Sequence, residues 1–373
     1  MQLRAFQQDL PDIMVQSVIT RHSKYLDKWC YELGLILKAV EAVWLLSGNR
    51  QYFNYIKDTI DRFIDSDGNI MGYDPYDLNL DMVNPGKILL LLYVETSDTR
   101  YKKAADTLRK QLDRQPRNHQ GGFWHKAIYP HQMWLDGVYM SSPFYAQYAM
   151  IFNQPEAYED IFNQVSLLAV NAKEPSTGLL YHAWDESRGM KWSDDTTGCS
   201  PHFWGRAMGW YAMALADILD FFPGSNPKRE TIINILKDLL SALIQVQDNN
   251  TGLWYQVVDL GKFKGNYLEA SASCMFTYAL SKSIANGYVD EAFKISALKA
   301  YEGILCHLTY MDDNGCINLK NVCSVAGLGG NPYRDGSFSY YISEPVVEND
   351  YKGYGPFMLA AVEMEKLRRK QLI

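Results

Sequence analysis

Apolar residues recur at positions i, i+3, i+4 and i+7 along several stretches of the chain, which is the spacing of one face of an amphipathic helix. The clearest stretches are residues 33–46, 101–112, 210–222 and 232–246. Between such stretches the helical period stops at turns that contain glycine. The pattern therefore predicts a protein built mainly from pairs of helices.

A turn with glycine that leads into a short aromatic or β-branched run occurs five times. Successive copies are 54, 56, 74 and 63 residues apart, measured at Gly68, Gly122, Gly178, Gly252 and Gly315. This period is typical of repeated supersecondary units, and five copies indicate about six helix–turn–helix units. We expect an all-α, closed (α/α)6 toroid rather than an open solenoid, because a ring buries the terminal faces that a solenoid must cap.

No low-complexity linker or run of charge divides the chain, so we expect one domain over residues 1–373. Residues 327–333 are rich in glycine and contain a proline, which excludes regular helix. We expect this segment to fold over the rim of the central cavity.

Composition excludes several classes of protein. Hydrophobic residues make up 47% of the chain and charged residues 21%, values typical of a globular protein. The longest apolar runs, such as residues 88–94, are far shorter than the roughly 20 residues of a membrane helix. A net charge of −7 disfavours nucleic acid and anionic membranes as partners, because both need a basic surface.

Cysteine usage and the first residues bear on the compartment. The six cysteines show no paired spacing, which favours reduced thiols in a cytoplasmic protein. Arg4, Asp9 and Asp12 interrupt the stretch that would be the apolar region of a secretory signal. We therefore expect a cytoplasmic protein, present as a monomer or a weak homodimer.

Polar aromatic residues gather in the middle of the chain. Five of the seven histidines and six of the nine tryptophans lie between residues 119 and 210. Tryptophan and tyrosine rings stack on the apolar faces of sugars while their N–H and O–H groups remain free to bond hydroxyls. This cluster indicates a carbohydrate site, although any single ring could equally be a core residue.

Two aspartates stand on apolar backgrounds. Asp136 lies between aromatic residues and is followed by Gly137, so burial should raise its pKa and allow it to act as a general acid. Asp81 lies in a similar setting and could pair with Asp136. Capping of a helix N-terminus is the structural alternative for both residues.

Motifs for metals and cofactors are not evident in the sequence. No pair of histidines has a spacing that would place two imidazoles on one helix face. The chain has no P-loop, no strand-linked dinucleotide motif and no serine nucleophile elbow. We expect neither a metal nor a nucleotide cofactor.

Several segments together resemble the unsaturated rhamnogalacturonyl hydrolases of glycoside hydrolase family 105. They are residues 122–126, 129–139, 181–185, 198–201, 204–211, 251–256 and 343–356. The resemblance implies an (α/α)6 fold and a metal-independent hydrolase of pectin-derived oligosaccharides. The expected partner is a small anionic oligosaccharide with an unsaturated uronic acid at its end.

The reaction that the resemblance implies begins with protonation of the C4=C5 double bond at C4. Water then adds at C5, and the hemiketal opens with loss of the aglycone, so no enzyme nucleophile is needed. By this resemblance Asp136 is the proton donor and water activator, and Asp81 holds ring hydroxyls and raises the pKa of Asp136. The sugar contacts it implies are His125, Trp134, His182, Arg206 and Trp210, with Tyr31 and Trp29 from the first hairpin.

Three alternatives remain open from the sequence. A hydrolase of unsaturated glucuronic acid in glycosaminoglycan or ulvan fragments would share the fold and the hydration chemistry. A sugar epimerase would use a pair of histidines as acid and base. A binding module without catalysis would use the same aromatic cluster and would not require Asp136.

Overall fold

Six helices form a closed inner ring in the computed structural model, which describes residues 9–373. Each inner helix packs against the next around the ring, and the last packs against the first. In ring order they are α2 (Tyr31–Ser47), α4 (Gly86–Thr96), α6 (Leu135–Ile151), α8 (Gly205–Ile218), α10 (Ala270–Ala285) and α13 (Tyr351–Arg369). Arg4 and the first eight positions of the expected 1–373 domain lie outside the described residues.

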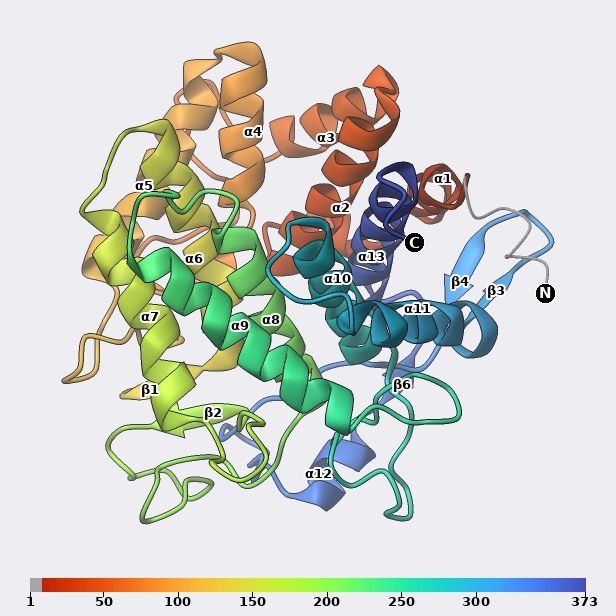
Figure 1. Cartoon of the computed structure of the whole chain (residues 1–373). Coiled ribbons are helices and arrows are strands. Elements are labelled where there is room, and N and C mark those ends of the chain that lie inside the picture. Colours follow the sequence, from red (N-terminus) through yellow and green to blue (C-terminus); the bar gives the residue numbers. More distant parts are fainter. Residues whose placement is uncertain (1–8) are drawn as a thin grey trace.

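A second helix covers the outside of each inner helix (Figure 1). In the same order these outer helices are α3 (Arg50–Asp61), α5 (Thr99–Arg114), α7 (Ala157–Asn171), α9 (Lys228–Gln245), α11 (Phe293–Gly303) and, against α13, α1 (Leu10–Arg21). Six helical hairpins thus close into an (α/α)6 toroid, which confirms the predicted fold class.

The inner helices differ from the outer ones in sequence because both of their sides are covered. Every residue of α8 is buried, and Gly209 lets this helix approach Met275 of α10 closely. The predicted helix at 210–222 was misplaced by several residues for this reason: a helix that is buried all round has no polar face to mark its start. Helix α5 keeps a clear polar face, and the predicted stretch 101–112 lies within its observed range of 99–114.

The repeated turns each follow an outer helix and lead to the next inner helix, so they lie at one end of the toroid. Their glycines have left-handed backbone angles, for example φ +84° at Gly68 and +75° at Gly178, where a side chain would be strained. In the second copy the left-handed residue is Gly121, the neighbour of the Gly122 used to measure the spacing. The sequence offers two adjacent glycines there, and the motif alone could not separate them.

Short strands and helices lie outside the ring, some of them below the long helices in Figure 1 and others at its right-hand side. Strand β1 (Gln132–Trp134) pairs antiparallel with β2 (Ala183–Asp185), with Met133 opposite Trp184. The remaining elements are β3 (Thr309–Met311), β4 (Ile317–Leu319), β5 (Val322–Cys323), β6 (Val346–Val347), α12 (Phe338–Ser343), the 3-10 helices η2 (Lys24–Asp27) and η3 (Leu80–Val83), and the π-helical turn η4 (Ile304–Leu308).

A buried polar cluster lies where the first and last inner helices meet. The ammonium of Lys352 on α13 lies 2.8 Å from Asp350 and 3.5 Å from Glu32 of α2. The hydroxyl of Tyr25 donates to the same Asp350 carboxylate at 3.0 Å. These contacts join residues more than 300 positions apart and complete the ring.

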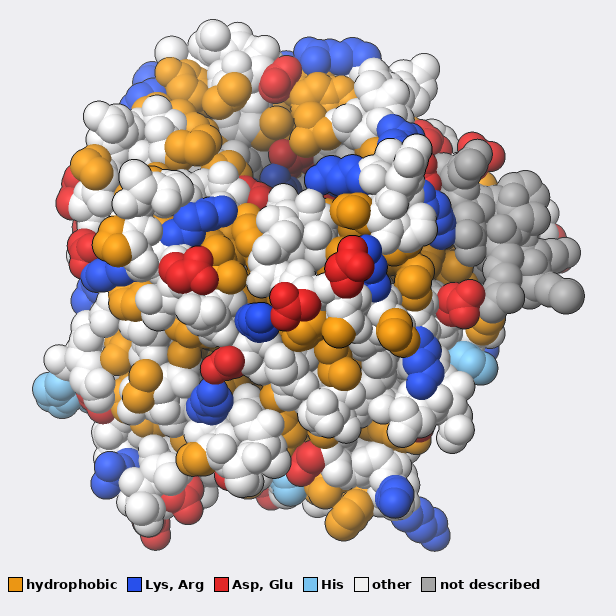
Figure 2. Space-filling view, viewed as in Figure 1, with side chains coloured by type: hydrophobic (Ala, Val, Ile, Leu, Met, Phe, Trp, Pro, Cys, Tyr) orange, Lys and Arg blue, Asp and Glu red, His pale blue; other side chains and the backbone are white. Residues whose placement is uncertain are grey.

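The remaining features of the structure are its surface charges, its cysteines and the apolar character of its helices. On the face shown in Figure 2, acidic and basic side chains are interspersed and form no broad basic area. All six cysteines are free thiols. Among residues 9–373, no helix combines the length and the apolar character that crossing a membrane requires.

Candidate active site

Asp136 lies in the first turn of α6, directly after strand β1. Trp134, with an extended backbone, occupies the N-cap position, so Asp136 is inside the helix and does not cap it. Its side chain is 13% exposed, and its Oδ2 atom has no hydrogen-bond partner among the described residues. Burial, with a further contribution from the negative charge of Asp81, raises the pKa of Asp136 to about 7. This carboxyl can therefore hold a proton near neutral pH.

Asp81 lies in η3 and has the opposite electrostatic setting. Asn79 caps this short helix by accepting from the Asp81 backbone N–H at 3.0 Å, so the Asp81 side chain is free for other contacts. Its carboxylate lies 2.6 Å from Lys126 Nζ and 3.3 Å from His125 Nε2. Burial opposes ionisation, but these two partners hold the pKa of Asp81 well below its usual range. One site thus contains a protonatable carboxyl and a permanent carboxylate.

His182 is fully buried beside Asp136. Its Nε2 atom lies 3.5 Å from Asp136 Oδ2, and its Nδ1 atom is hydrogen-bonded to the Tyr341 hydroxyl at 2.8 Å. Burial lowers the pKa of His182 well below its ordinary value, so the imidazole is neutral. Tyr341 comes from α12, which brings a C-terminal residue to the central site.

An aromatic wall stands next to these groups. The rings of His125 and Tyr129 lie nearly parallel to Trp134, with centroids 4.9 and 5.0 Å from it. Gly137 makes this arrangement possible, because a Cβ atom there would lie 2.9 Å from His125 Nδ1. Leu328 packs in one apolar cluster with Trp134, so the segment at 327–333 does fold over this wall.

Two predicted sugar contacts lie beneath the surface of the site. Arg206 is 1% exposed; its Nε donates to Ser271 Oγ at 2.7 Å, and its Nη2 faces Glu269 and the carbonyl of Cys323. Trp210 is also 1% exposed and stacks on Tyr139. Both side chains present almost no surface to a ligand here, because contacts between the inner helices already occupy them.

The first-hairpin residues are divided between the core and the site. Trp29 is buried and donates from its indole Nε1 to the Met82 carbonyl at 2.8 Å, so it supports η3 and through it Asp81. Tyr31 is partly exposed, and its ring meets the edge of Trp210 at 6.1 Å. Tyr31 therefore remains available as a contact, whereas Trp29 does not.

Sequence reasoning did not single out three residues that the fold brings to the site. Lys126 lies in the segment 122–126, but the sequence does not indicate that it pairs with Asp81. Tyr341 and Arg334 come from the C-terminal region, and Arg334 Nη2 lies 3.4 Å from the Tyr129 hydroxyl. Among residues 9–373 no carboxylate lies within 4 Å of the Arg334 guanidinium. Only the glycine-rich loop before Arg334 gave a local signal.

The carboxyl groups of this site are poorly suited to hold a metal, since Asp81 is already paired with Lys126. One group of possible ligands occurs among the described residues, namely His119, His131 and Glu186. It lies at the end of the β1–β2 ladder away from Asp136, because Gln132 pairs with Asp185 there while Trp134 pairs with Ala183.

Comparisons with known proteins identify glycoside hydrolases as relatives of this chain. The model of Glycosyl Hydrolase Family 88 matches residues 10–368. A solved glycoside hydrolase of family 105 from C. acetobutylicum ATCC 824 is 48% identical to this chain. The match covers 95% of this chain and 99% of that chain, with a TM-score of 0.94. The unsaturated rhamnogalacturonyl hydrolase YesR of Bacillus subtilis is 28% identical over 74% of this chain and 77% of its own length. The unsaturated glucuronyl hydrolase from Bacillus sp. GL1, 13% identical with a TM-score of 0.64, shares the fold.

Proposed function

Because the chain belongs to glycosyl hydrolase family 88 and is a glycoside hydrolase, we propose that it removes the terminal 4,5-unsaturated uronic acid from rhamnogalacturonan-derived oligosaccharides. The observation that carries this proposal is the contrast between the two carboxyl groups. Asp136 can hold a proton near neutrality, while Asp81 is an anion tied to Lys126. Hydration of a vinyl ether needs one proton donor and no enzyme nucleophile, and this site offers that set of groups.

In the proposed reaction the Asp136 carboxyl protonates C4 of the unsaturated ring. Positive charge develops at C5 and the ring oxygen, and water attacks C5 while the Asp136 carboxylate accepts a proton from that water. The hemiketal then opens to a ketone at C5 and releases the aglycone from C1. Asp136 ends the cycle in the protonated state in which it began.

Asp81 and His182 assist without exchanging protons in the chemical step. The Asp81 charge helps to keep Asp136 protonated and can accept hydrogen bonds from ring hydroxyls. The neutral His182 imidazole, held by Tyr341, restrains the Asp136 carboxyl from the buried side. Arg334 supplies a positive charge for the uronate carboxylate, since it has no acidic partner among residues 9–373.

The choice of rhamnogalacturonan over glycosaminoglycan fragments is supported by the relatives. YesR, named for unsaturated rhamnogalacturonan fragments, is 28% identical, whereas the glucuronyl hydrolase from Bacillus sp. GL1 is 13% identical. Loss of the ultraviolet absorbance of the conjugated double bond tests the choice directly. We expect consumption of the unsaturated rhamnogalacturonan disaccharide by wild type and not by Asp136→Asn.

A control is Asp259→Asn, which changes an exposed aspartate outside this site whose pKa is also raised, mainly by loss of hydration. Its activity should equal that of wild type. Consumption of unsaturated glucuronyl disaccharides alone would transfer the proposal to that substrate class. If the wild type binds the disaccharide tightly but neither it nor either variant turns the disaccharide over, the protein would instead be a binding module.

A further inference from the structure

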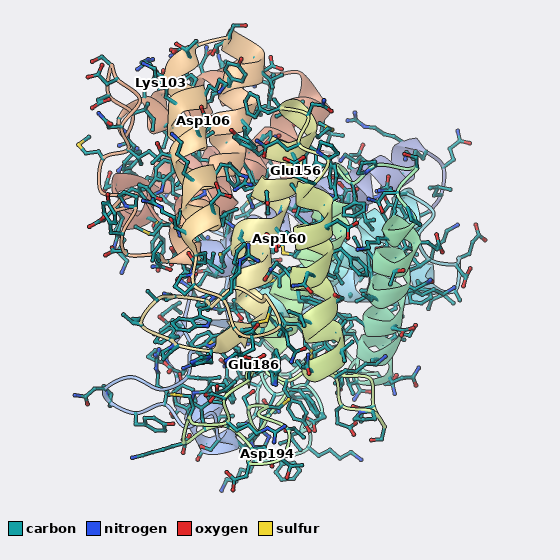
Figure 3. All side chains as sticks on the ribbon, turned by 90° about the vertical axis from the view of Figure 1, so that its left-hand side faces the viewer. Lys103, Asp106, Glu156, Asp160, Glu186 and Asp194 are labelled. Atoms are coloured by element: carbon teal, nitrogen blue, oxygen red, sulfur yellow. The ribbon has the colours of Figure 1, made fainter. Side chains whose placement is uncertain are left out.

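Three possible metal ligands meet at the loop end of the toroid, outside the site described above. His119 and His131 belong to the loop between α5 and β1, and Glu186 is the first residue after β2. One ligand atom from each of the three lies within 4.8 Å of the other two. Figure 3 shows Glu186 among the loops that extend beyond the ends of the helices.

Two of the three side chains are held in place before any ion binds. Glu186 is 11% exposed, and its carboxylate accepts from the backbone N–H groups of His119 at 2.8 Å and Gln120 at 3.2 Å. His131 has a left-handed backbone, with φ +62°, and its ring packs 4.9 Å from the Trp124 ring. The third side chain, His119, is 85% exposed and can adjust.

His131 also carries an unsatisfied polar atom. Its Nδ1 is buried and has no hydrogen-bond partner among the described residues. Buried polar atoms almost always have a partner, and such an exception requires an explanation such as a water or an ion. The His119 ring lies 5.7 Å from the His131 ring and nearly parallel to it, and its Nδ1 already lies 3.0 Å from Glu186 Oε2.

We propose that His119, His131 and Glu186 form a binding site for one divalent transition-metal ion. Two imidazoles and one carboxylate are a donor set suited to Zn²⁺, with water as a fourth ligand. Ligand atoms about 2.1 Å from a shared tetrahedral ion are about 3.4 Å apart. The His119–Glu186 pair is already near this separation, and the other two pairs of ligand atoms lie within 4.8 Å.

The ion would fasten the loop before β1 to the turn after β2. In addition to the contacts of the Glu186 carboxylate with His119 and Gln120, these segments are joined by the Glu186 backbone N–H, which donates to the His131 carbonyl at 3.2 Å. The same loop carries His125 and Lys126, the two partners of Asp81. The role of the ion is therefore structural, and no step of the hydrolysis passes through it.

Zinc titration of the untagged full-length protein, first treated with a chelator, tests the proposal without measuring hydrolysis. We expect calorimetry to show one Zn²⁺ per chain, and a rise in Tm of about 3 °C at zinc concentrations 100 times the Kd. His119→Ala, which truncates an exposed side chain, should weaken zinc binding at least tenfold. His131→Asn should do the same while keeping a residue that tolerates the left-handed backbone.

His22→Ala is the matched control, because His22 is also exposed and hydrogen-bonded to a carboxylate, Asp27, at 3.1 Å. This variant should bind zinc as wild type does. Absence of saturable zinc binding to the wild type, or equal affinity in His119→Ala and His131→Asn, would overturn the proposal. Neither result depends on whether the protein hydrolyses unsaturated uronides.

Discussion

The Nε2 atom of His182 lies 3.5 Å from Oδ2 of Asp136, and neither atom has a hydrogen-bond partner among residues 9–373. The two atoms thus face each other in a space without solvent access. A neutral imidazole cannot balance a carboxylate charge, so this arrangement favours the protonated acid. Burial of this side of Asp136 is therefore consistent with its raised pKa.

The first prediction concerns the pH dependence of turnover. Asp136 must be protonated to donate, and burial raises its pKa to about 7. The value of kcat should therefore be constant at mildly acidic pH and fall tenfold per pH unit above about 7. Steady-state rates on the unsaturated disaccharide between pH 5 and 9 measure this limb.

The same rate measurement on the Asp81→Asn variant tests whether the Asp81 charge raises the pKa of Asp136. Removing the Asp81 charge removes one of the causes that raise the pKa of Asp136, so the alkaline limb should move to lower pH. An unchanged limb in this variant would show that Asp81 does not act on Asp136 through charge.

The second prediction concerns stability. The pKa of the Asp136 carboxyl is higher in the folded protein than in the unfolded chain, so the folded state binds more protons between these two values. The free energy of unfolding should therefore fall as the pH rises from about 4 to 7. Asp136→Asn should therefore stabilise the protein by about 4 kcal/mol at pH 8 and have little effect near pH 4. Denaturant unfolding at the two pH values measures the difference, and a pH-independent effect would contradict it.

Tyr341 is predicted to act as a positioning residue through His182. Tyr341→Phe removes the hydroxyl that holds His182 Nδ1, so kcat should fall about tenfold while KM changes little. Tyr278→Phe is a matched control, because Tyr278 is also buried and donates to Asp217 at 2.6 Å away from the site. Equal loss of kcat in both variants would indicate a general effect on packing.

Arg334 is predicted to bind the carboxylate of the substrate. Arg334→Gln should raise KM at least tenfold with a smaller change in kcat, because a charge-assisted contact to the uronate is lost. Arg188→Gln, which changes an exposed arginine in the turn after β2, should leave KM unchanged. Initial rates over a range of substrate concentrations separate the two constants.

Lys126 is predicted to stabilise the fold through Asp81. The side chains of Lys126 and Asp81 are 23% and 15% exposed. Lys126→Met therefore removes the cation that pairs with the mostly buried Asp81 carboxylate. We expect a loss of about 3 kcal/mol in the free energy of unfolding. Lys173→Met breaks an exposed pair with Asp238, 37% and 66% exposed, and should cost less than about 1 kcal/mol. Similar losses in the two variants would show that burial of the pair is unimportant.

The architecture could be predicted from the sequence because each repeat contains its own local sequence signals. The glycine at a turn such as Gly178 is required by a left-handed backbone, and the outer helices have an apolar and a polar face. The start of α8 could not be predicted, since Gly205 begins a helix that is buried on all sides. A pattern of apolar and polar residues can locate the start of a helix only where the burial of successive residues changes.

Within the site, the apolar context of Asp136 correctly indicated a buried acid, but its catalytic role stays a prediction. A motif cannot distinguish a side chain that contacts a ligand from one that supports its neighbours, and Arg206 and Trp210 illustrate this limit. The proximity of His119 to Glu186, 67 positions along the chain, depends on the pairing of β1 with β2. Spacing rules for histidines on one helix could not reveal it.

The contact between α2 and α13 through Lys352, Asp350 and Glu32 should determine how the protein unfolds. An open array of repeats can fray from either end, one unit at a time. Here the end units are each other's neighbours, so fraying must first break a buried ionic contact. Asp136 therefore sits in a structure whose loss should be all-or-none, and amide hydrogens of α6 and α13 should exchange with the same opening free energy despite their distance in sequence.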